Sequence, residues 1–310
     1  MRKRDILISI IVPTKNRHHY LCRAIKSIID QTYTNWECFI IDDNSEIPVN
    51  ESINHLVEDD QRFTLIRNSY PHFASQSRNL GIKKATGKFI AFLDDDDYWD
   101  RDKLKLQMNF MIENKYKVSY CWSTLIESEN KFSFREPEIY GNIFDLMLEG
   151  QPLCNCSTFM ASKIALEKVG CFNKYLKRGN DGDLIRKLSE YYQIGVLKKN
   201  LVFYQVNTEG SNISTNNLIG IKRSLKSYKY RLHFFKKDLK NRPIQYANIN
   251  LEIARCYAKI NIFNMSLKYF LQSLKSYILF LRVIIFKVIR IFCLILLIPF
   301  IYVKNKIFNL

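Results

Sequence analysis

The chain has 310 residues and is 47% hydrophobic, so it can bury the core of one large domain with an appendage, and two equal domains are not indicated. Its formal net charge is +17. Residues 221–310 hold 18 Lys and Arg against only Asp238 and Glu252, a net +16, which leaves about +1 for residues 1–220. The charge therefore suggests a polyanionic partner for the last third of the chain. Residues 1–220 are nearly neutral and give no such indication.

The eight cysteines form no CxxC pair and no Cys/His spacing of the zinc type, so a zinc module is not expected. Several lie in apolar stretches, as Cys38 and Cys121 do, which is typical of buried free thiols in a reducing compartment. The first apolar run ends at Pro13 and lacks the length and cleavage site of a signal peptide. We therefore expect a protein that faces the cytosol.

Apolar runs and helical spacings alternate along the first 122 residues. The expected strands are 6–12, 36–41, 63–67, 88–93 and 118–122, and the expected helices are 17–31, 49–58, 74–85 and 101–114. This alternation predicts βαβ units and an α/β fold with a mostly parallel sheet. The pattern is then less regular, with strands expected at 155–161 and 196–206 and helices at 162–169, 181–192, 246–260 and 265–277.

Three polar segments each follow the end of an expected strand: Pro13–Arg17, Asp42–Ser45 and Asp94–Asp97. Ligands of open α/β sheets bind outside the carboxyl ends of the strands. We therefore expect these segments to meet at one edge of the sheet and to form the binding site.

Four successive aspartates, Asp94–Asp97, make up the last of these segments. Adjacent carboxylates repel one another, and a divalent cation relieves the repulsion because hard cations take oxygen ligands. The alternative is a solvated acidic turn that caps the helix at 101–114. The position after a buried strand favours the metal site, with Mn²⁺ or Mg²⁺ held by one or two carboxylates and by phosphate oxygens.

Other phosphate chemistries would leave signatures that are missing. No GxxxxGK[ST] loop is present and no GxGxxG follows the first strand, which argues against P-loop and dinucleotide sites. A sugar nucleotidyltransferase shares the fold class and metal use, but Pro13–Arg17 lacks the glycines of its early loop. A basic nucleic-acid-binding protein is a rival from another class, yet the cations here lie beside an apolar run and not among exposed aromatic residues.

The segments together carry a family pattern. They are Ser9–Arg17, Gln31–Tyr33, Trp36–Glu37, Ile41–Ser45, Ala74–Ile82, Ala85–Gly87 and Phe92–Trp99. In order and spacing they resemble the family 2 glycosyltransferases, closely over residues 6–125 and loosely over 126–206. The resemblance implies a GT-A fold, a nucleoside-diphosphate-sugar donor with UDP as the expected nucleotide, and an inverting, metal-dependent transfer of the hexosyltransferase type.

The resemblance also implies roles for single residues. The donor site would include Pro13, Thr14, Asn16, Arg17, Asp42, Asp43, Arg78 and Asp95. In it, Asp43 would accept a hydrogen bond from the base, Asp42 and Ser45 would shape the turn, and Arg78 would approach the diphosphate. Asp96 would bind the metal, with Asp94 and Asp97 as further candidates.

An inverting transfer needs a base that deprotonates the acceptor hydroxyl. The segment Arg178–Leu184 is similar to the family's Glu-Asp-x-Asp-Leu setting, with Asn180 in place of the first acid. The resemblance makes Asp181 the base and Asp183 the second candidate. The alternative is that Asp181 only caps the helix that follows it.

The apolar residues from Tyr277 to Val303 are interrupted by Arg282, Lys287 and Arg290. The unbroken part, 291–303, is shorter than the roughly 20 residues that a membrane span needs, so we favour a helix that lies in the interface of an anionic membrane over a span or a soluble helix packed on the enzyme. Three segments are then expected: a GT-A domain over 1–210, a helical extension over 211–276 and a membrane-associating segment over 277–310. Such a protein would sit on the cytoplasmic face of the cell membrane, peripherally or anchored at its C-terminus, and would build cell-surface polysaccharide on a glycan or lipid-linked acceptor.

Overall fold

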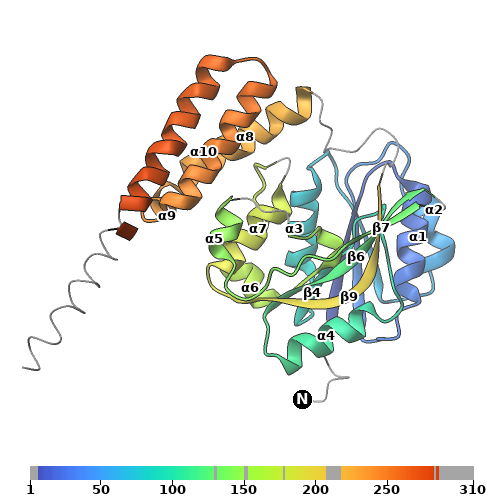
Figure 1. Ribbon diagram of the computed structural model, residues 1–310. Coiled ribbons are helices and arrows are strands. Elements are labelled where there is room, and N and C mark those ends of the chain that lie inside the picture. Colours follow the sequence, from blue (N-terminus) through green and yellow to red (C-terminus); the bar gives the residue numbers. More distant parts are fainter. Residues whose placement is uncertain are drawn as a thin grey trace, which may run out of the picture. The chain divides into compact units, whose positions relative to one another are not determined.

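The computed structural model describes residues 6–128, 131–149, 153–176, 179–206, 218–282 and 284–285. The chain divides into two compact units, Met1–Asn212 and Ile213–Leu310. The first unit is an α/β domain, and the described part of the second is helical (Figure 1).

One sheet of nine strands runs through the first unit in the order β3-β2-β1-β4-β8-β6-β9-β5, with β7 paired to β6. The strands are β1 Ile8–Thr14, β2 Trp36–Asp42, β3 Phe63–Arg67, β4 Phe89–Phe92, β5 Tyr98–Trp99, β6 Val118–Ser128, β7 Lys131–Arg135, β8 Phe159–Ser162 and β9 Ile194–Gln205. Strands β3, β2, β1 and β4 are parallel, β8 is antiparallel to β4 and β6, and β6 and β9 are again parallel. The α/β class that the sequence predicted is confirmed.

Helices cover both faces of this sheet (Figure 1). They are α1 His18–Ile29, α2 Asn50–Val57, α3 Ala74–Lys84, α4 Lys103–Glu113, α5 Phe144–Glu149, α6 Lys163–Lys168 and α7 Asn180–Ser189. Along β1, Ile8, Ile10 and Val12 point into a core shared with α1, α2 and α4. Ile11 points the other way, into a core shared with α3, α5, α6 and α7. Both faces of the strand are buried, which is why it reads as an unbroken apolar run.

Several elements differ from the prediction. The expected strand at 155–161 begins only at Phe159, because residues 156–158 form a 3₁₀ turn that the Asn155 side chain caps at the Thr158 N–H (3.2 Å). The short strand β5, the strand β7 and the helix α5 were not predicted. Strand β5 consists of two residues whose pairing with β9 lies about a hundred residues away in the chain, so no local pattern marks it.

The second unit contains α8 Leu218–Phe234, α9 Lys236–Leu239, α10 Pro243–Lys259 and a helix at 263–282. The predicted helical pair at 246–260 and 265–277 is confirmed. Within the described residues, no helix combines the length and apolarity needed to cross a bilayer. Residues 286–310, which hold most of the expected membrane-associating segment, lie outside the described part of the chain.

The cysteines follow the expectation of unpaired thiols. Seven of them are described, and all seven are free, with Cys38, Cys121 and Cys256 among the buried ones. Burial raises the pKa of the Cys38 and Cys121 thiols, the latter to about 12, so both are held in the unreactive protonated form.

Candidate active site

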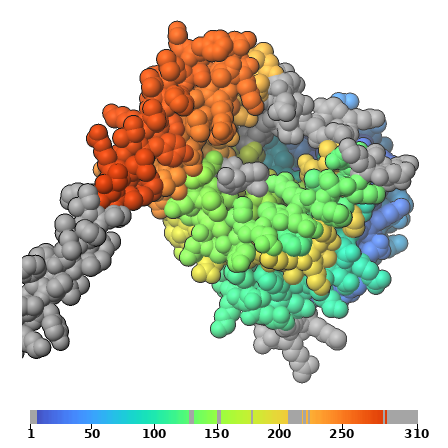
Figure 2. Space-filling view, viewed as in Figure 1, coloured from blue at the N-terminus to red at the C-terminus, as the bar shows by residue number. Residues whose placement is uncertain are grey.

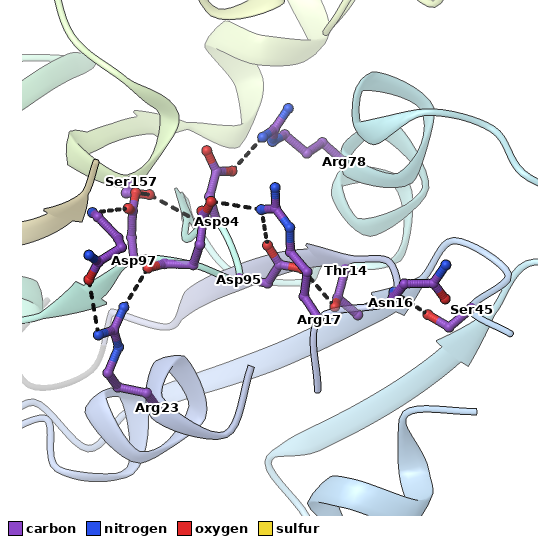
Figure 3. A network of polar contacts seen from close by, with 12 residues as sticks. Thr14, Asn16, Arg17, Arg23, Ser45, Arg78, Asp94, Asp95, Asp97 and Ser157 are labelled. Carbon is purple, nitrogen blue, oxygen red and sulfur yellow. Dashed lines mark hydrogen bonds and ion pairs between the residues drawn. The ribbon is translucent and has the colours of Figure 1, made fainter. Parts of the chain in front are cut away.

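The three polar segments meet at the carboxyl edge of the parallel strands, as expected. Thr14 at the end of β1 lies in register with Asp42 at the end of β2, and its carbonyl accepts the Asp43 N–H at 2.8 Å. The Thr14 hydroxyl donates to Asp95 Oδ2 at 2.8 Å. Figure 3 shows Thr14, Asn16 and Arg17 on one side of the acidic turn and Ser157 on the other.

The four aspartates of the turn fall into two pairs by exposure. Asp97 is wholly buried and the side chain of Asp95 is 7% exposed, whereas those of Asp94 and Asp96 are 27% and 17% exposed. The four residues form a tight turn, which is closed by a hydrogen bond from the Asp97 N–H to the Asp94 carbonyl (3.0 Å). Only Asp94 and Asp96 offer carboxylates that a ligand can reach.

The buried pair holds the turn in place. The Ser157 hydroxyl donates to Asp97 Oδ2, and the Gln205 N–H donates to Oδ1 at 3.2 Å. Burial raises the pKa of Asp97 well above its ordinary range, and the nearby Asp96 and Asp94 raise it further. Burial likewise raises the pKa of Asp95 to about 6, although Arg17 opposes the shift. Asp97 was predicted as a possible metal ligand, but both of its carboxylate oxygens accept hydrogen bonds from within the protein.

Each reachable carboxylate has an arginine partner. Arg17 Nη1 donates to Asp96 Oδ2 at 2.7 Å and to Asp95 Oδ1 at 3.0 Å, and Arg78 Nη2 donates to Asp94 Oδ1. Burial lowers the pKa of both guanidinium groups, but the acids outweigh it, so both pKa values are raised. The site thus places two permanent cations beside two accessible anions (Figure 3).

The acidic turn has a donor set that suits a divalent cation. Carboxylate oxygens are the ligands that Mg²⁺ and Mn²⁺ prefer, and such ions commonly take only one or two of them together with phosphate oxygens. Among the described residues, no group of three or more His, Cys, Asp or Glu side chains is arranged to hold a metal by itself. The exposed carboxylates of Asp94 and Asp96 therefore have the chemistry to take part in holding such a cation, together with ligands from outside the protein.

The turn after β2 is built by Asp42. Its Oδ1 accepts the Ser45 N–H at 2.9 Å, and its Oδ2 pairs with Arg67 Nη1 at 3.3 Å. Ser45 in turn accepts the Asn16 N–H at 2.9 Å, which ties this turn to the segment after β1. Asn16 lies at a positive φ of 54°, a conformation that asparagine tolerates better than most residues.

Asp43 organises the segment that leads into α3. Its Oδ1 accepts hydrogen bonds from Asn68 Nδ2 (2.8 Å) and from the His72 N–H (2.7 Å), and its Oδ2 accepts one from the Phe73 N–H (3.0 Å). Phe73, whose φ is 72°, is the residue that precedes α3. Through this segment Asp43 fixes the start of the helix that carries Arg78.

Among the remaining donor candidates, Pro13 and Thr14 are the last two residues of β1 and are buried. The structure therefore brings all eight predicted donor residues to one edge of the sheet, although six of them are buried: Pro13, Thr14, Asp42, Asp43, Arg78 and Asp95. Their roles toward a nucleotide stay predictions.

The two candidate bases lie in the first turn of α7 and have different surroundings. Asp183 is half-buried, with 7% of its side chain exposed, and lies near two cations of its own helix, Lys187 at 3.7 Å and Arg186 at 3.9 Å. Asp181 is half-buried, and its Oδ1 accepts the neighbouring Gly182 N–H at 2.9 Å. Burial raises the pKa of Asp181, while Arg78 lowers it and Asp94 raises it, which places this carboxylate within electrostatic reach of the acidic turn.

The helix cap does not account for Asp181. Helix α7 starts at Asn180, its N-cap is Gly179 in a left-handed conformation, and none of the side chains that the structure describes caps it. The alternative in which Asp181 serves only as the N-cap is therefore wrong.

Three residues that hold the acidic turn were not predicted: Ser157, Arg23 and Gln205. Arg23 Nη2 donates to the Asp96 carbonyl (2.7 Å), its Nη1 donates to Gln205 Oε1 (3.3 Å), and its guanidinium lies 4.6 Å from the centre of the Tyr98 ring. Together the three fasten the acidic turn to α1, to the end of β9 and to the 3₁₀ turn (Figure 3). None of them stands in a motif of its own, so the sequence carried no signal for them.

Comparison with curated proteins finds glycosyltransferases. An uncharacterised glycosyltransferase of Rickettsia bellii is 32% identical over 217 residues, 69% of this chain and 30% of that protein. The Escherichia coli protein WfgD, a UDP-Glc:alpha-D-GlcNAc-diphosphoundecaprenol beta-1,3-glucosyltransferase, is 40% identical over 116 residues, 37% of this chain and 45% of that one. The chain spans about a third of the length of the first curated relatives that it matches.

Comparison with solved structures supports the fold. S. aureus TarS 1-349 in complex with UDP-GlcNAc is similar over 87% of this chain and 91% of that one, with a TM-score of 0.59 and 16% identity. The Pyrobaculum calidifontis mannosyltransferase PcManGT, in complex with GDP-Man and Mn²⁺, is similar over 84% and 73%, with a TM-score of 0.56 and 15% identity. The profile of glycosyl transferase family 2 matches residues 9–170, more than half of the chain. This chain, with its GT-A domain and its acidic turn at the carboxyl edge of the sheet, belongs to glycosyl transferase family 2.

Proposed function

We propose that the protein transfers a sugar from a nucleoside-diphosphate sugar, with UDP as the nucleotide, to a hydroxyl of a glycan or lipid-linked acceptor in cell-surface polysaccharide synthesis. The observation that carries the proposal is the pairing of Asp94 and Asp96 with Arg78 and Arg17 at the carboxyl edge. Family membership supports the transferase class. The name of WfgD, a UDP-Glc enzyme with a diphosphoundecaprenol acceptor, supports the donor and the acceptor.

The donor diphosphate would lie between the two arginines. A guanidinium group suits phosphate because its planar fork donates two parallel hydrogen bonds. Arg17 has 28% of its side chain exposed and can turn from Asp96 toward a phosphate, whereas Arg78 is 9% exposed and its position is fixed by Asp94. The Asp42 and Asp43 turn would line the nucleoside side of the site, with Asn16 beside it.

Asp96 and Asp94 would hold a Mn²⁺ or Mg²⁺ ion together with the diphosphate. When bound, such an ion supplies positive charge that stabilises the departing diphosphate. Asp95 and Asp97 would keep the two ligands in place through Thr14 and Ser157. Residues that orient the metal ligands in this way commonly affect how tightly a metal site binds its ion.

Asp181 would act as the base of an inverting transfer. A base must be charged at working pH, yet basic enough to accept a proton, and burial moves Asp181 in that direction. Its place near Arg78 puts it on the same side as the expected diphosphate. Asp183 is less suited because Lys187 and Arg186 flank it.

The protein would work at the cytoplasmic face of the cell membrane, attached at its surface or through its C-terminal segment. The net charge of +16 over residues 221–310 supports an anionic lipid surface as a partner. A diphospholipid acceptor is confined to such a surface, so attachment would bring the active site to its substrate.

A donor-hydrolysis screen tests the proposal. UDP-Glc, UDP-GlcNAc and GDP-Man are each incubated with the full chain and with Mn²⁺, Mg²⁺ or EDTA, and the free nucleoside diphosphate is measured. We expect release from at least one UDP-sugar, dependent on the metal, and its absence from every donor in every buffer would refute the proposal.

The matched pair Asp181→Asn and Asp183→Asn tests the base. Asp181→Asn should lower transfer to an acceptor by about 10²–10⁴-fold while donor binding, followed by calorimetry, stays near that of the wild type. Asp183→Asn should keep most of the transfer. Near-normal transfer by Asp181→Asn would exclude it as the base.

A further inference from the structure

The helix at 263–282 uses only part of its surface to pack against α10. The Ser266 hydroxyl donates to the Ala254 carbonyl at 3.0 Å, and the Tyr269 ring stacks on Tyr257 with centroids 5.7 Å apart. Nearer the end of the helix, the Tyr277 hydroxyl donates to Asn248 Oδ1. These contacts mark one side of the helix as its inner face.

The other side carries an apolar stripe that is open to solvent. Its members recur every three or four residues and are 44–68% exposed: Phe263, Leu267, Phe270, Leu274, Ile278 and Leu281. A spacing of three and four places all six on one face of a helix. Contiguous apolar surface of this kind marks an interaction site, since monomeric soluble proteins rarely leave it uncovered. Figure 2 shows the surface of this helix in deep orange.

A row of cations runs beside the stripe. Lys268, Lys275 and Arg282 follow one another at intervals of seven residues, so they share one line along the helix, and all three are exposed. No acidic residue occurs anywhere from 253 to 310, whereas nine Lys and Arg do. The stripe and the row together give a helix face that is apolar and positively charged.

The charge decides between two kinds of partner. A second copy of the same face would bring cations against cations with no acid to offset them, which is unfavourable in a symmetric pair. An anionic bilayer suits both features, because apolar side chains enter the acyl boundary while Lys and Arg extend their stems to the headgroups.

We infer that the open face of the helix at 263–282 docks on an anionic phospholipid surface, with the apolar stripe at the acyl boundary and the three cations among the headgroups. The inference rests on the proposed membrane location and sharpens it. The docking face belongs to the folded helical unit and begins at Phe263, well before the segment at 277–310 that the sequence pointed to.

Vesicle flotation of the full chain tests the inference, with phosphatidylcholine vesicles that contain or lack phosphatidylglycerol. The stripe variant is L267Q/L274Q, and its control is L146Q/I164Q, which changes two exposed apolar residues on α5 and α6. The row variant is K268Q/K275Q/R282Q, and its control is K83Q/K105Q/K117Q, three exposed lysines of the first unit. Circular dichroism melts verify that each variant is folded.

We expect the wild type and both controls to float with anionic vesicles. The stripe variant should lose at least about tenfold in partition coefficient. The row variant should lose about fivefold per cation on anionic vesicles and little on neutral ones. Flotation of both variants at the wild-type level would overturn the inference. It would also be overturned if the wild type did not bind vesicles but sedimented as a dimer that L267Q/L274Q converts to a monomer, because the stripe would then be a contact between two copies of the chain.

Release of nucleoside diphosphate from the donor, measured without vesicles, separates this inference from the proposed function. A chain that hydrolyses the donor but ignores vesicles would sink the docking face alone. A chain that docks through the stripe but hydrolyses no donor would sink the proposed function alone.

Discussion

Lys103, at the first turn of α4, is a buried cation whose removal should stabilise the protein. The residue is wholly buried, and its Nζ has no hydrogen-bond acceptor among the described residues. It lies 4.0 Å from the centre of the Trp99 ring, which is its main electrostatic compensation. A cation at the N-terminal end of a helix also opposes the helix dipole. Lys103→Met removes the charge and keeps an unbranched side chain that is shorter by one heavy atom.

The magnitude follows from the pKa of Lys103. Burial lowers this pKa from an ordinary 10.5 to about 8, and the difference corresponds to about 3 kcal/mol at pH 7. Loss of the contact with Trp99 returns about 1 kcal/mol, so the free energy of unfolding should rise by about 2 kcal/mol. The sign is clear, because below pH 8 both the folded and the unfolded chain carry the proton and the folded chain bears the full cost of burial.

Raising the pH should remove this advantage. Between pH 8 and 10.5 the unfolded state holds more protons on Lys103 than the folded state does, so the wild type gains stability with pH while the variant lacks this gain. By pH 9.5 the two proteins should be nearly equal in stability.

Urea unfolding followed by tryptophan fluorescence measures the effect. All three tryptophans lie in the first unit, so the signal reports on that unit alone. Lys105→Met, an exposed position on the same helix, is the control and should change stability little at either pH. A Lys103→Met protein that is less stable than the wild type at pH 7, or a difference that does not shrink by pH 9.5, would refute the reasoning.

Three further outcomes are expected. Gly87→Ala should cost about 1–3 kcal/mol in urea unfolding, because the new Cβ would lie 2.6 Å from Ser9 Oγ and 2.7 Å from the Ser9 nitrogen; an unchanged midpoint would contradict the packing described. Ser157→Ala should lower the free energy of unfolding by about 1–3 kcal/mol, since it leaves the buried Asp97 carboxylate without its hydroxyl donor, and should also slow donor hydrolysis. Asp96→Asn should raise the Mn²⁺ concentration for half-maximal hydrolysis at least about tenfold, and an unaltered metal titration would remove Asp96 from the metal site.

The location of the site was predictable because it depends on local patterns and one general rule. Apolar runs gave β1, β2 and β4, and the rule for parallel sheets placed the polar segment after each of them at one edge. Thr14 and Asp95, eighty-one positions apart, are joined by a hydrogen bond that this rule anticipates.

The contacts that distinguish one aspartate from another were not predictable. Ser157 reaches Asp97 across sixty positions, and Gln205 reaches it across more than a hundred, so no window of sequence contains the pair. Lys103 illustrates the same limit, because a lysine on an amphipathic helix is expected in solvent, and only packing under Trp99 buries it. The helical spacing of Arg186 and Lys187 from Asp183 could be read from the sequence, but the burial of Asp181 near Arg78 and Asp94 depends on packing between distant segments.

The four aspartates can be understood as a balance of charge that the protein leaves incomplete. Fully ionised, they carry four negative charges, and three arginines contact the turn, Arg17 and Arg78 at carboxylates and Arg23 at the Asp96 carbonyl. One negative charge then remains at the turn, which favours a cation there. Burial and the charges of Asp96 and Asp94 raise the pKa of Asp97, and the hydrogen bonds from Ser157 and Gln205 oppose this shift.

Added positive charge at Asp94 and Asp96 would lower the pKa of Asp97, because its neighbours are among the causes that raise it. Cation binding should therefore release a proton, and the affinity for Mn²⁺ should rise with pH. The buried Asp95 and Asp97 would in this way be coupled to the cation without binding it, because they hold the turn in place and interact electrostatically with Asp94 and Asp96.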